Sequence, residues 1–370
     1  MKLKKFFAGV LAAAMMLTVG ATAAFATEGS NTKPTVDRRQ MIVADGNDVA
    51  NFTLTKKLVV AKGTAPQKMT FNFTVGDGQA DTAKKIKAGI VPTNFTQPSV
   101  TFSKTGNDKF TVSTDNSAYS NTFNIDLVKL LGGNSNKVGK YAYTISEDDT
   151  KIPGITKDNR TLKMVVTVVN KTDDNLGPDT GYGYYVGLFN QDGSKADDFT
   201  NTYNAYDLTV KKVVKGNFAD LDDPFTFYIT LGNAEGKDNN YASATVKVSD
   251  TNNAANNATW TIGGGQQTVI LKHGQTATIS NLPVGVTYTV TENKTNDDGS
   301  AWVYTTTGEA KSEDNKTIVA GDNKVEIVNK HEGTPDMGVV LDNAPYIAML
   351  AIVAIGGVAL MLNKRRRDEE

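Results

Sequence analysis

The chain has 370 residues and a formal net charge of −1 at pH 7, so it lacks the basic excess that would make nucleic acid an expected partner. It contains no cysteine, which excludes a disulfide framework. Its two histidines, His273 and His331, argue against a zinc site or a histidine-based catalytic site, and no cofactor is expected.

The first 26 residues have the layout of a secretory signal peptide. Early lysines precede an apolar run over residues 6–19, and the small-residue pattern Ala24-Phe25-Ala26 follows. We expect cleavage after Ala26 and export of the rest of the chain. Residues 27–50 are polar with little periodicity and are predicted to form an N-terminal lead-in.

The body of the chain alternates apolar and polar residues in short runs that are separated by Gly, Asn and Asp clusters. This pattern is typical of β-sandwiches. The clearest predicted strands are residues 68–75, 141–147, 162–170, 208–214, 225–231 and 287–292. One short helical turn is expected within residues 124–131, and the fold class is therefore all-β.

An internal repeat divides the body into two halves. The matching pairs are residues 52–58 with 208–214, 141–147 with 286–292, and 199–201 with 327–329. About 300 residues lie between the two ends of the chain, which suits two domains. We predict one domain over residues 51–204 and a second over 205–333.

Each half places charged and amide residues on the apolar side of its predicted strands. Lys56 has the same parity as Leu54 and Leu58, and successive side chains of a strand point to opposite faces. The same parity argument turns five more residues inward: Lys212, Glu147, Glu292, Asn201 and Asn329. Burial of an unpaired charge costs several kcal/mol, so these residues need a common explanation.

The explanation that we favour is a self-forming isopeptide bond in each half. Desolvation lowers the pKa of a lysine and raises that of a glutamate, which leaves a neutral amine beside a protonated carboxyl group. The predicted bonds join Lys56 to Asn201 with the assistance of Glu147, and Lys212 to Asn329 with that of Glu292. The glutamates would hydrogen-bond the amide oxygen and shuttle protons while ammonia leaves.

The alternative is that these residues lie at strand ends and form ordinary salt bridges or extend to water. The order Lys, Glu, Asn occurs in both halves, and this duplication favours the isopeptide bonds.

The C-terminal region combines an apolar segment with a basic tail. Residues 344–362 are uncharged, and about 19 residues suffice for a helix to cross a bilayer. Four basic residues beginning at Lys364 follow, which indicates a cytoplasmic end. The segment Thr334-Pro335-Asp336-Met337-Gly338 precedes the span.

The chain resembles the two-domain major pilins of streptococcal type, which are built from pilin isopeptide-linkage domains. The likeness runs from about Asn51 to Lys364. It rests on the first-strand motifs at residues 52–56 and 208–212, the Tyr-x-Ile/Val-x-Glu strands at 143–147 and 288–292, and the segment 281–286. The resemblance implies two tandem immunoglobulin-like β-sandwich domains, stacked end to end in a covalent fibre.

Residues 334–370 resemble a sortase sorting signal, with cleavage expected between Met337 and Gly338. The usual motif has Thr where this chain has Met337. In the streptococcal family the acceptor amine lies in a Gly-Ser-Lys segment shortly before the bonding Asn, which implies Lys195 as the inter-subunit acceptor. An ordinary solvated lysine at position 195 and a plain C-terminal membrane anchor remain the alternatives.

The expected function is that of a structural shaft subunit of a cell-wall-anchored surface pilus. Its expected partners are sortase, other copies of itself and peptidoglycan, with a host surface ligand as a further candidate. The alternative is a non-polymerising wall-anchored adhesin that binds a host ligand, which would not use Lys195. We find no catalytic set beyond the two triads, so no enzyme is predicted.

Overall fold

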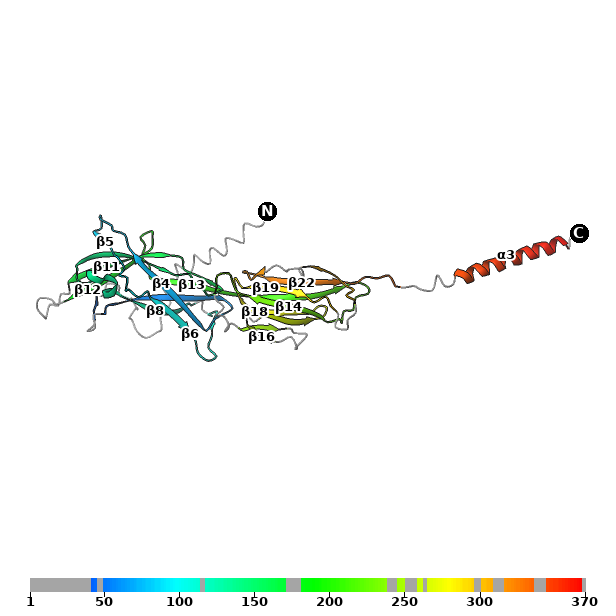
Figure 1. Cartoon of the computed structure of the whole chain (residues 1–370), viewed down its shortest axis with the longest axis horizontal. Helices are drawn as coiled ribbons and strands as arrows, with labels where there is room; N and C mark the ends of the chain where they lie inside the picture. Colours follow the sequence, from blue (N-terminus) through cyan, green and yellow to red (C-terminus); the bar gives the residue numbers. More distant parts are fainter. Residues whose placement is uncertain are drawn as a thin grey trace, which may run out of the picture. The chain divides into compact units, whose positions relative to one another are not determined.

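The computed structural model describes residues 41–44, 49–113, 117–170, 181–237, 245–249, 258–261, 265–295, 301–308, 316–335 and 344–367. The chain divides into two units, Met1–Met41 and Ile42–Glu370. The predicted signal peptide and most of the lead-in lie outside the described residues. The helices and strands that the structure describes belong to the second unit, and Figure 1 shows them within the whole chain.

The first sandwich has one sheet of seven strands. Their order is β1 (Ile42–Val43), β12 (Tyr182–Phe189), β11 (Thr161–Asn170), β9 (Gly139–Glu147), β4 (Lys68–Asp77) and β6 (Ser99–Ser103), with β5 (Ile86–Ala88) parallel to β9.

The facing layer is the first part of a nine-stranded sheet. It contains β8 (Tyr119–Asp126), β2 (Asn51–Lys62) and the start of β13 (Asp198–Lys215), with β10 (Ile155–Thr156) paired to β13. Strands β3 (Thr64–Ala65) and β7 (Phe110–Thr111) form a separate pair. The short helix α2 (Leu127–Leu131) begins where the Asp126 side chain accepts hydrogen bonds from two backbone N–H groups, and η1 (Gly132–Asn134) follows it.

The second sandwich uses the rest of the nine-stranded sheet. Its strands there are β16 (Ala258–Thr261), β15 (Thr245–Ser249), β18 (Thr276–Pro283), the end of β13, β22 (Asn323–Lys330) and β20 (Thr305–Gly308). The facing sheet has four strands: β17 (Gln266–Leu271), β14 (Phe225–Gly232), β19 (Thr287–Glu292) and β21 (Lys316–Thr317).

Strand β13 is shared by the two sandwiches. It pairs in parallel with β2 from Asp198 to Asn204 and then with β22 from Leu208 to Lys215. Its buried residues have odd numbers up to Ala205 and even numbers from Leu208, with the partly buried Tyr206 and the exposed Asp207 between them. The register with β18 shifts at the same place, so an irregularity there reverses the inward face of the strand.

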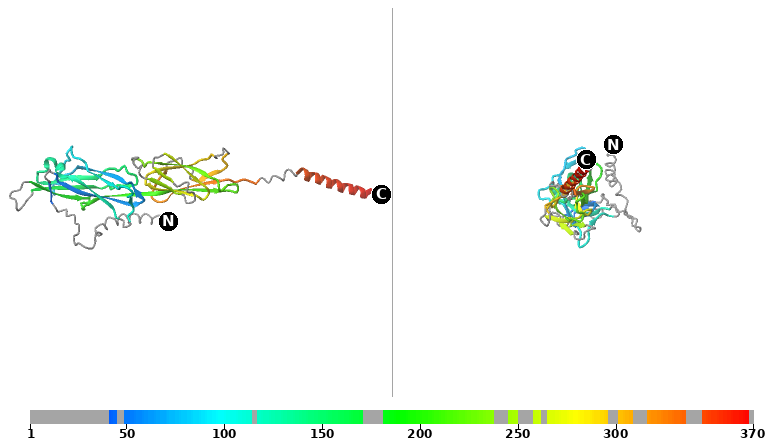
Figure 2. Two further views of the ribbon diagram at one scale, coloured as in Figure 1. Left: turned by 90° about the horizontal axis from the view of Figure 1, so that it is seen from below. Right: turned by 90° about the vertical axis from the view of Figure 1, so that its right-hand side faces the viewer.

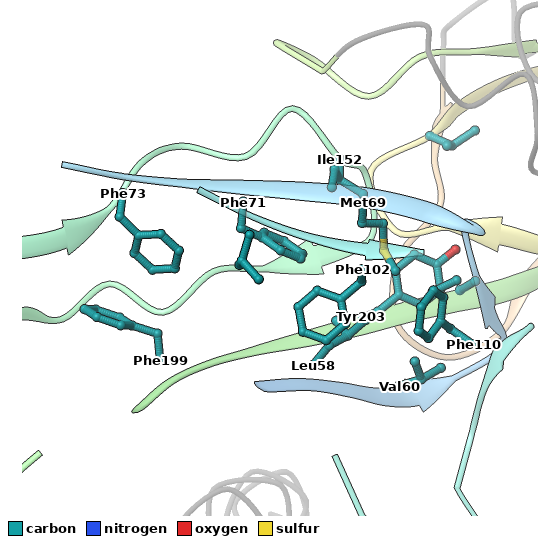
Figure 3. Packing of buried hydrophobic residues seen from close by; sticks show 14 of the residues in the cluster. Leu58, Val60, Met69, Phe71, Phe73, Phe102, Phe110, Ile152, Phe199 and Tyr203 are labelled. Carbon is teal, nitrogen blue, oxygen red and sulfur yellow. The ribbon is translucent and has the colours of Figure 1, made fainter. Parts of the chain in front are cut away.

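The core of the first sandwich contains a group of packed aromatic side chains, including Phe71, Phe73 and Phe102 (Figure 3). Phe73 stacks on Phe123 with ring centroids 4.2 Å apart, and Phe71 meets Phe102 edge to face at 5.8 Å. Full burial of one such side chain contributes about 1.5 to 3 kcal/mol. Buried residues of both sandwiches belong to one continuous cluster.

Hydrogen bonds join the two sandwiches. Asn281 has a left-handed backbone (φ +65°), and its side chain accepts from Thr64 N (2.7 Å) and donates to Thr64 O (3.1 Å). Gly154 N donates to Val284 O at 2.9 Å. The backbone at Thr64 and Gly154 in the first sandwich is therefore satisfied by the second.

The C-terminal helix α3 (Ala344–Arg367) is drawn in red in Figure 2. Its window Ala348–Arg365 has a mean hydropathy of 1.5 and is not buried, so by length and composition it could cross a membrane.

The predicted all-β fold with two sandwiches is confirmed. Each strand that was predicted from alternation lies within an observed strand, and α2 is the expected short turn of helix.

Candidate functional site

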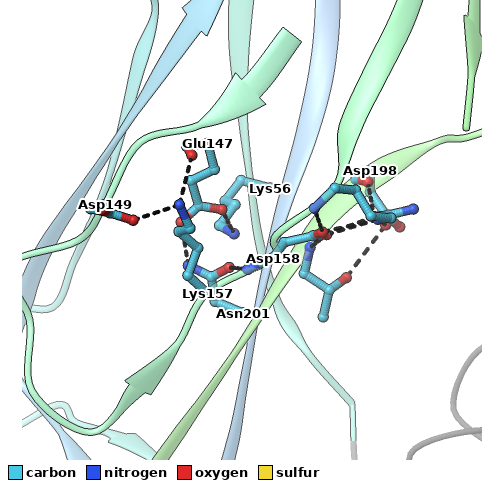
Figure 4. A network of polar contacts seen from close by, with 9 residues as sticks. Lys56, Glu147, Asp149, Lys157, Asp158, Asp198 and Asn201 are labelled. Atoms are coloured by element: carbon cyan, nitrogen blue, oxygen red, sulfur yellow. Dashed lines mark hydrogen bonds and ion pairs between the residues drawn. The ribbon is translucent and has the colours of Figure 1, made fainter. Parts of the chain in front are cut away.

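Lys56 and Asn201 lie on neighbouring parallel strands of the first sandwich (Figure 4). Lys56 on β2 is opposite Phe199 on β13, and Asn201 is opposite Leu58. The two residues are therefore diagonal neighbours on the same face of the sheet. Both side chains are completely buried.

Lys212 and Asn329 repeat this arrangement in the second sandwich. Lys212 on β13 is opposite Ile327 on β22, and Asn329 is opposite Val214. In both sandwiches the lysine is thus opposite the residue two positions before the asparagine. Both side chains are again completely buried.

The glutamates reach these pairs from the facing sheets. Glu147 is the last residue of β9 and is opposite Phe73 on β4, whereas Glu292 is the last residue of β19 and is opposite Phe227 on β14. Each glutamate is 4% exposed, although a strand end is the place where a charged side chain could most easily reach water. The structure therefore brings together the residues of both predicted triads.

In the first triad the carboxyl group of Glu147 contacts both nitrogen atoms. Its Oε2 accepts a hydrogen bond from Lys56 Nζ at 2.6 Å, and its Oε1 accepts one from Asn201 Nδ2. A single group thus lies between the amine and the amide nitrogen, where it can move a proton from one to the other.

In the second triad one oxygen makes both contacts. Oε1 of Glu292 accepts from Lys212 Nζ at 2.6 Å and from Asn329 Nδ2 at 2.8 Å. The hydroxyl of Thr306 donates to the other oxygen, Oε2, at 3.3 Å.

Aromatic rings pack against both buried lysines. Nζ of Lys56 lies 5.1 Å from the ring centre of Phe71, and Nζ of Lys212 lies 4.1 Å from that of Phe225 and 5.8 Å from that of Phe227. Sequence reasoning did not identify these rings. The signal was present as a Phe-x-Phe pattern after each lysine strand, at residues 71–73 on β4 and 225–227 on β14.

This environment shifts proton affinities toward neutral groups. Burial lowers the pKa of Lys56, although the nearby Glu147 opposes the shift, and burial raises the pKa of Glu147 against the opposing effect of Lys56. Burial likewise lowers the pKa of Lys212 to about 8. The arrangement thus favours an uncharged amine nucleophile next to a carboxamide.

One detail differs from the sequence-based expectation. The glutamates were expected to hydrogen-bond the amide oxygen, but both contact the amide nitrogen. In the first triad Oδ1 of Asn201 instead accepts from the backbone N–H of Asp158 at 2.8 Å (Figure 4). Asp158 was not identified from the sequence, because it lies in a loop without periodicity.

Lys195 lies in the loop between β12 and β13, and its side chain is exposed. The loop is held by backbone bonds from Asn190 N to Ser194 O (2.8 Å) and from Ala196 N to Leu188 O (3.1 Å). Lys195 forms no ion pair with any residue that the structure describes. It is not part of either triad.

The predicted sorting motif is only partly described. Thr334 and Pro335 are exposed, whereas Asp336, Met337 and Gly338 lie outside the described residues. Just before the motif, Asn217 Nδ2 donates to Gly333 O at 2.8 Å, and Gly333 N donates to Asn217 Oδ1 at 3.1 Å. Within the described part of the chain, no group of three or more His, Cys, Asp or Glu could hold a metal ion.

Comparison with known proteins identifies relatives of this chain. Residues 52–204 match the family model described as Spy0128-like isopeptide containing domain, and residues 206–331 match a domain family of unknown function, DUF7601. A protein named pilin from Streptococcus pyogenes serotype M1 is 32% identical over 255 residues, which cover 62% of this chain and 68% of the relative.

Solved structures show the same fold. A mutant of the major pilin from Streptococcus pyogenes aligns with a TM-score of 0.53 at 22% identity over 77% of this chain and all of the other. The unaltered major pilin aligns with a TM-score of 0.51 at 23% identity, over 77% of this chain and 99% of the other. The chain therefore belongs to the pilin family, as a backbone pilin of streptococcal type.

Proposed function

We propose that this chain is the shaft subunit of a sortase-assembled surface pilus, and that each of its sandwiches is closed by a self-formed isopeptide bond. The observation that carries the proposal is the pair of buried Lys–Glu–Asn triads with the same strand offset. As ordinary salt bridges, both pairs would bear the full cost of burying charge.

The proposed reaction starts from a neutral lysine amine and a protonated glutamate. Nζ of Lys56 attacks Cγ of Asn201, and the proton that Nζ loses passes through the carboxyl group of Glu147 to Nδ2. The Cγ–Nδ2 bond then breaks and ammonia leaves. Lys212 and Asn329 would form the second bond with the assistance of Glu292, and ammonia would again be the leaving group. Each site reacts once, so the product is a structural cross-link.

Polymerisation would use different residues. A sortase would cleave between Met337 and Gly338 and transfer the new carboxyl group of Met337 to Lys195 of another copy. The exposed position of Lys195 on a hydrogen-bonded loop supports this assignment. A contact between two different surfaces of identical subunits gives an open filament.

Export and anchoring complete the proposal. Residues 1–26 would be removed as a signal peptide, residues 51–204 and 205–333 would form the two shaft domains, and α3 would hold the chain in the membrane before sorting. The last subunit would be transferred to peptidoglycan.

The intact mass of the recombinant body, residues 28–333, tests the bonds. We expect this body to be lighter than its sequence by two molecules of ammonia. Glu147→Ala and Glu292→Ala should each restore one ammonia. Glu326→Ala is the matched control, because Glu326 pairs with Lys211 on the exposed face, and it should leave both losses unchanged. An unmodified mass of the unaltered body would reject the bonds.

A further inference from the structure

The loop between β10 and β11 determines how the Asn201 amide is oriented. The backbone N–H of Asp158 lies 2.8 Å from Oδ1 of Asn201 and can only donate. The oxygen of the amide must therefore face Asp158, and the nitrogen must face Glu147. The carbonyl that the lysine attacks thus already accepts a hydrogen bond from a fixed donor.

The side chain of Asp158 fixes this loop to β13 and to Arg160. Its carboxylate accepts hydrogen bonds from Thr200 N (2.9 Å), from Arg160 N (3.1 Å), and from Nε (2.9 Å) and Nη2 (2.7 Å) of Arg160. Thr200 directly precedes Asn201. Nη2 of Arg160 also donates to the backbone oxygen of Asp198 at 2.6 Å. The N–H donor and the amide that it contacts are therefore held by one network.

The side chain of Asp158 is largely buried, at 7% exposure. Burial raises the pKa of Asp158, but the hydrogen bonds from Arg160 and Thr200 outweigh this effect and hold its pKa below the ordinary value. The carboxylate thus stays charged and keeps these bonds.

The second sandwich lacks an equivalent contact among the residues that the structure describes. Oδ1 of Asn329 is buried and has no hydrogen-bond partner there. The additional donor in that site, Thr306, contacts Glu292 instead. The triads match in their three main residues and differ in what surrounds the amide oxygen.

We propose that the backbone N–H of Asp158 stabilises the oxyanion that forms on Asn201 during bond formation, and that the Asp158 carboxylate is the positioning group for this donor. This inference rests on the proposed isopeptide chemistry of the first sandwich. When Nζ of Lys56 adds to Cγ, the negative charge develops on Oδ1, 2.8 Å from the donor. The charge returns to the carbonyl as ammonia leaves, and Glu147 is protonated before and after the reaction.

The sharpest test removes only the N–H group. Aspartate at position 158 is replaced by its α-hydroxy acid counterpart during cell-free synthesis of the full-length chain in detergent, which turns one amide into an ester and keeps the side chain. Samples are quenched in acid at intervals, digested, and assayed by mass spectrometry for both cross-linked peptides. The same replacement at Asn159 is the matched control.

We expect the first bond to form about 100-fold more slowly in the ester chain, because loss of one oxyanion donor costs about 10² to 10³ in rate. The second bond should form at its usual rate and serves as an internal control for folding. An unchanged rate for the first bond would overturn the inference. Absence of the first bond from the unaltered chain would instead reject the proposed function itself.

Side-chain variants test the positioning role. Asp158→Ala keeps the N–H but releases the loop, so the first bond should form at least 10-fold more slowly. Asp158→Asn keeps an acceptor for Thr200 N and should recover most of the rate. Equal slowing in both variants, or slowing of both bonds, would contradict a positioning role for the Asp158 side chain.

Discussion

Nζ of Lys212 lies 2.6 Å from Oε1 of Glu292, and both side chains are inaccessible to solvent. Burial lowers the pKa of this lysine to about 8, compared with about 10.4 in an unfolded chain. The variant Asn329→Ala cannot form the second bond, so its Lys212 keeps a free amine. Between about pH 8 and about 10.4, this amine binds fewer protons in the folded chain than in the unfolded chain.

It follows that the free energy of unfolding of Asn329→Ala should rise with pH from about 8 to about 10 and should be lowest below pH 8. Urea denaturation at several pH values measures this dependence. In Lys212→Met/Asn329→Ala the contribution of this lysine is removed, so the rise should be smaller. Identical slopes in the two chains would show that Lys212 is not the titrating group.

Loss of either bond should lower thermal and protease resistance. Each bond closes a loop of roughly 100 residues or more, which stabilises the folded state by about 4 to 5 kcal/mol on the chain-entropy model. Lys56→Met and Lys212→Met should therefore unfold at clearly lower temperatures in calorimetry.

The neighbouring lysines provide matched controls for these two variants. Lys57 directly follows Lys56, and its side chain is 32% exposed. Lys211 directly precedes Lys212, and its side chain is 48% exposed. Lys57→Met and Lys211→Met should keep both bonds and change stability little. If they destabilised as much as the buried variants, the cross-links would not be the cause.

Sorting should leave Met337 as the new C-terminus, joined to an amine. Protein released from the cell wall by muralytic enzymes can be digested, and its C-terminal peptide identified by mass spectrometry. Recovery of peptides that extend beyond Gly338 would show that α3 is a lasting membrane anchor and not part of a sorting signal.

Lys195→Ala should abolish the ladder of high-mass multimers on denaturing gels but preserve folding, both internal bonds and wall attachment. The residue lies on an exposed loop outside both triads, so its loss removes only the acceptor amine. Lys109→Ala, at another exposed lysine, should leave the ladder intact. A ladder that persists without Lys195 would assign the acceptor to another lysine, and a single band in the unaltered strain would favour the monomeric adhesin.

Strand parity was enough to predict the buried triads, because alternation along a strand is a local property of the sequence. It predicted that Lys56 shares the buried face of its strand with Leu54 and Leu58. It also predicted that Lys212 shares that face with Val210, and the structure shows both arrangements. The inward parity of β13 reverses at Tyr206 and Asp207. If the parity of Asn201 had been continued past this point, Lys212 would have been predicted to face outward.

The contacts around Asn201 could not be predicted in this way. Asp158 and Arg160 lie in a short loop, and only the folded chain brings the Asp158 N–H to the amide oxygen. The orientation of that amide is a tertiary property, so the expected bond from Glu147 to the oxygen was replaced by one to the nitrogen.

The continuity of β13 determines how tension would pass through a shaft that is joined through Lys195 and Met337. The shortest covalent route runs along residues 195–212, crosses the bond from Lys212 to Asn329, and leaves along residues 329–337. On this route the proposed second bond would carry the load, whereas the proposed bond from Lys56 to Asn201 would lie off it. Without the second bond, residues 213–328 would enter the route and could lengthen each subunit by roughly 400 Å when fully extended. Resistance of the fibre to stretching would therefore depend on one amide in each subunit, the proposed bond from Lys212 to Asn329. The proposed first bond would instead preserve the fold of the sandwich that presents Lys195.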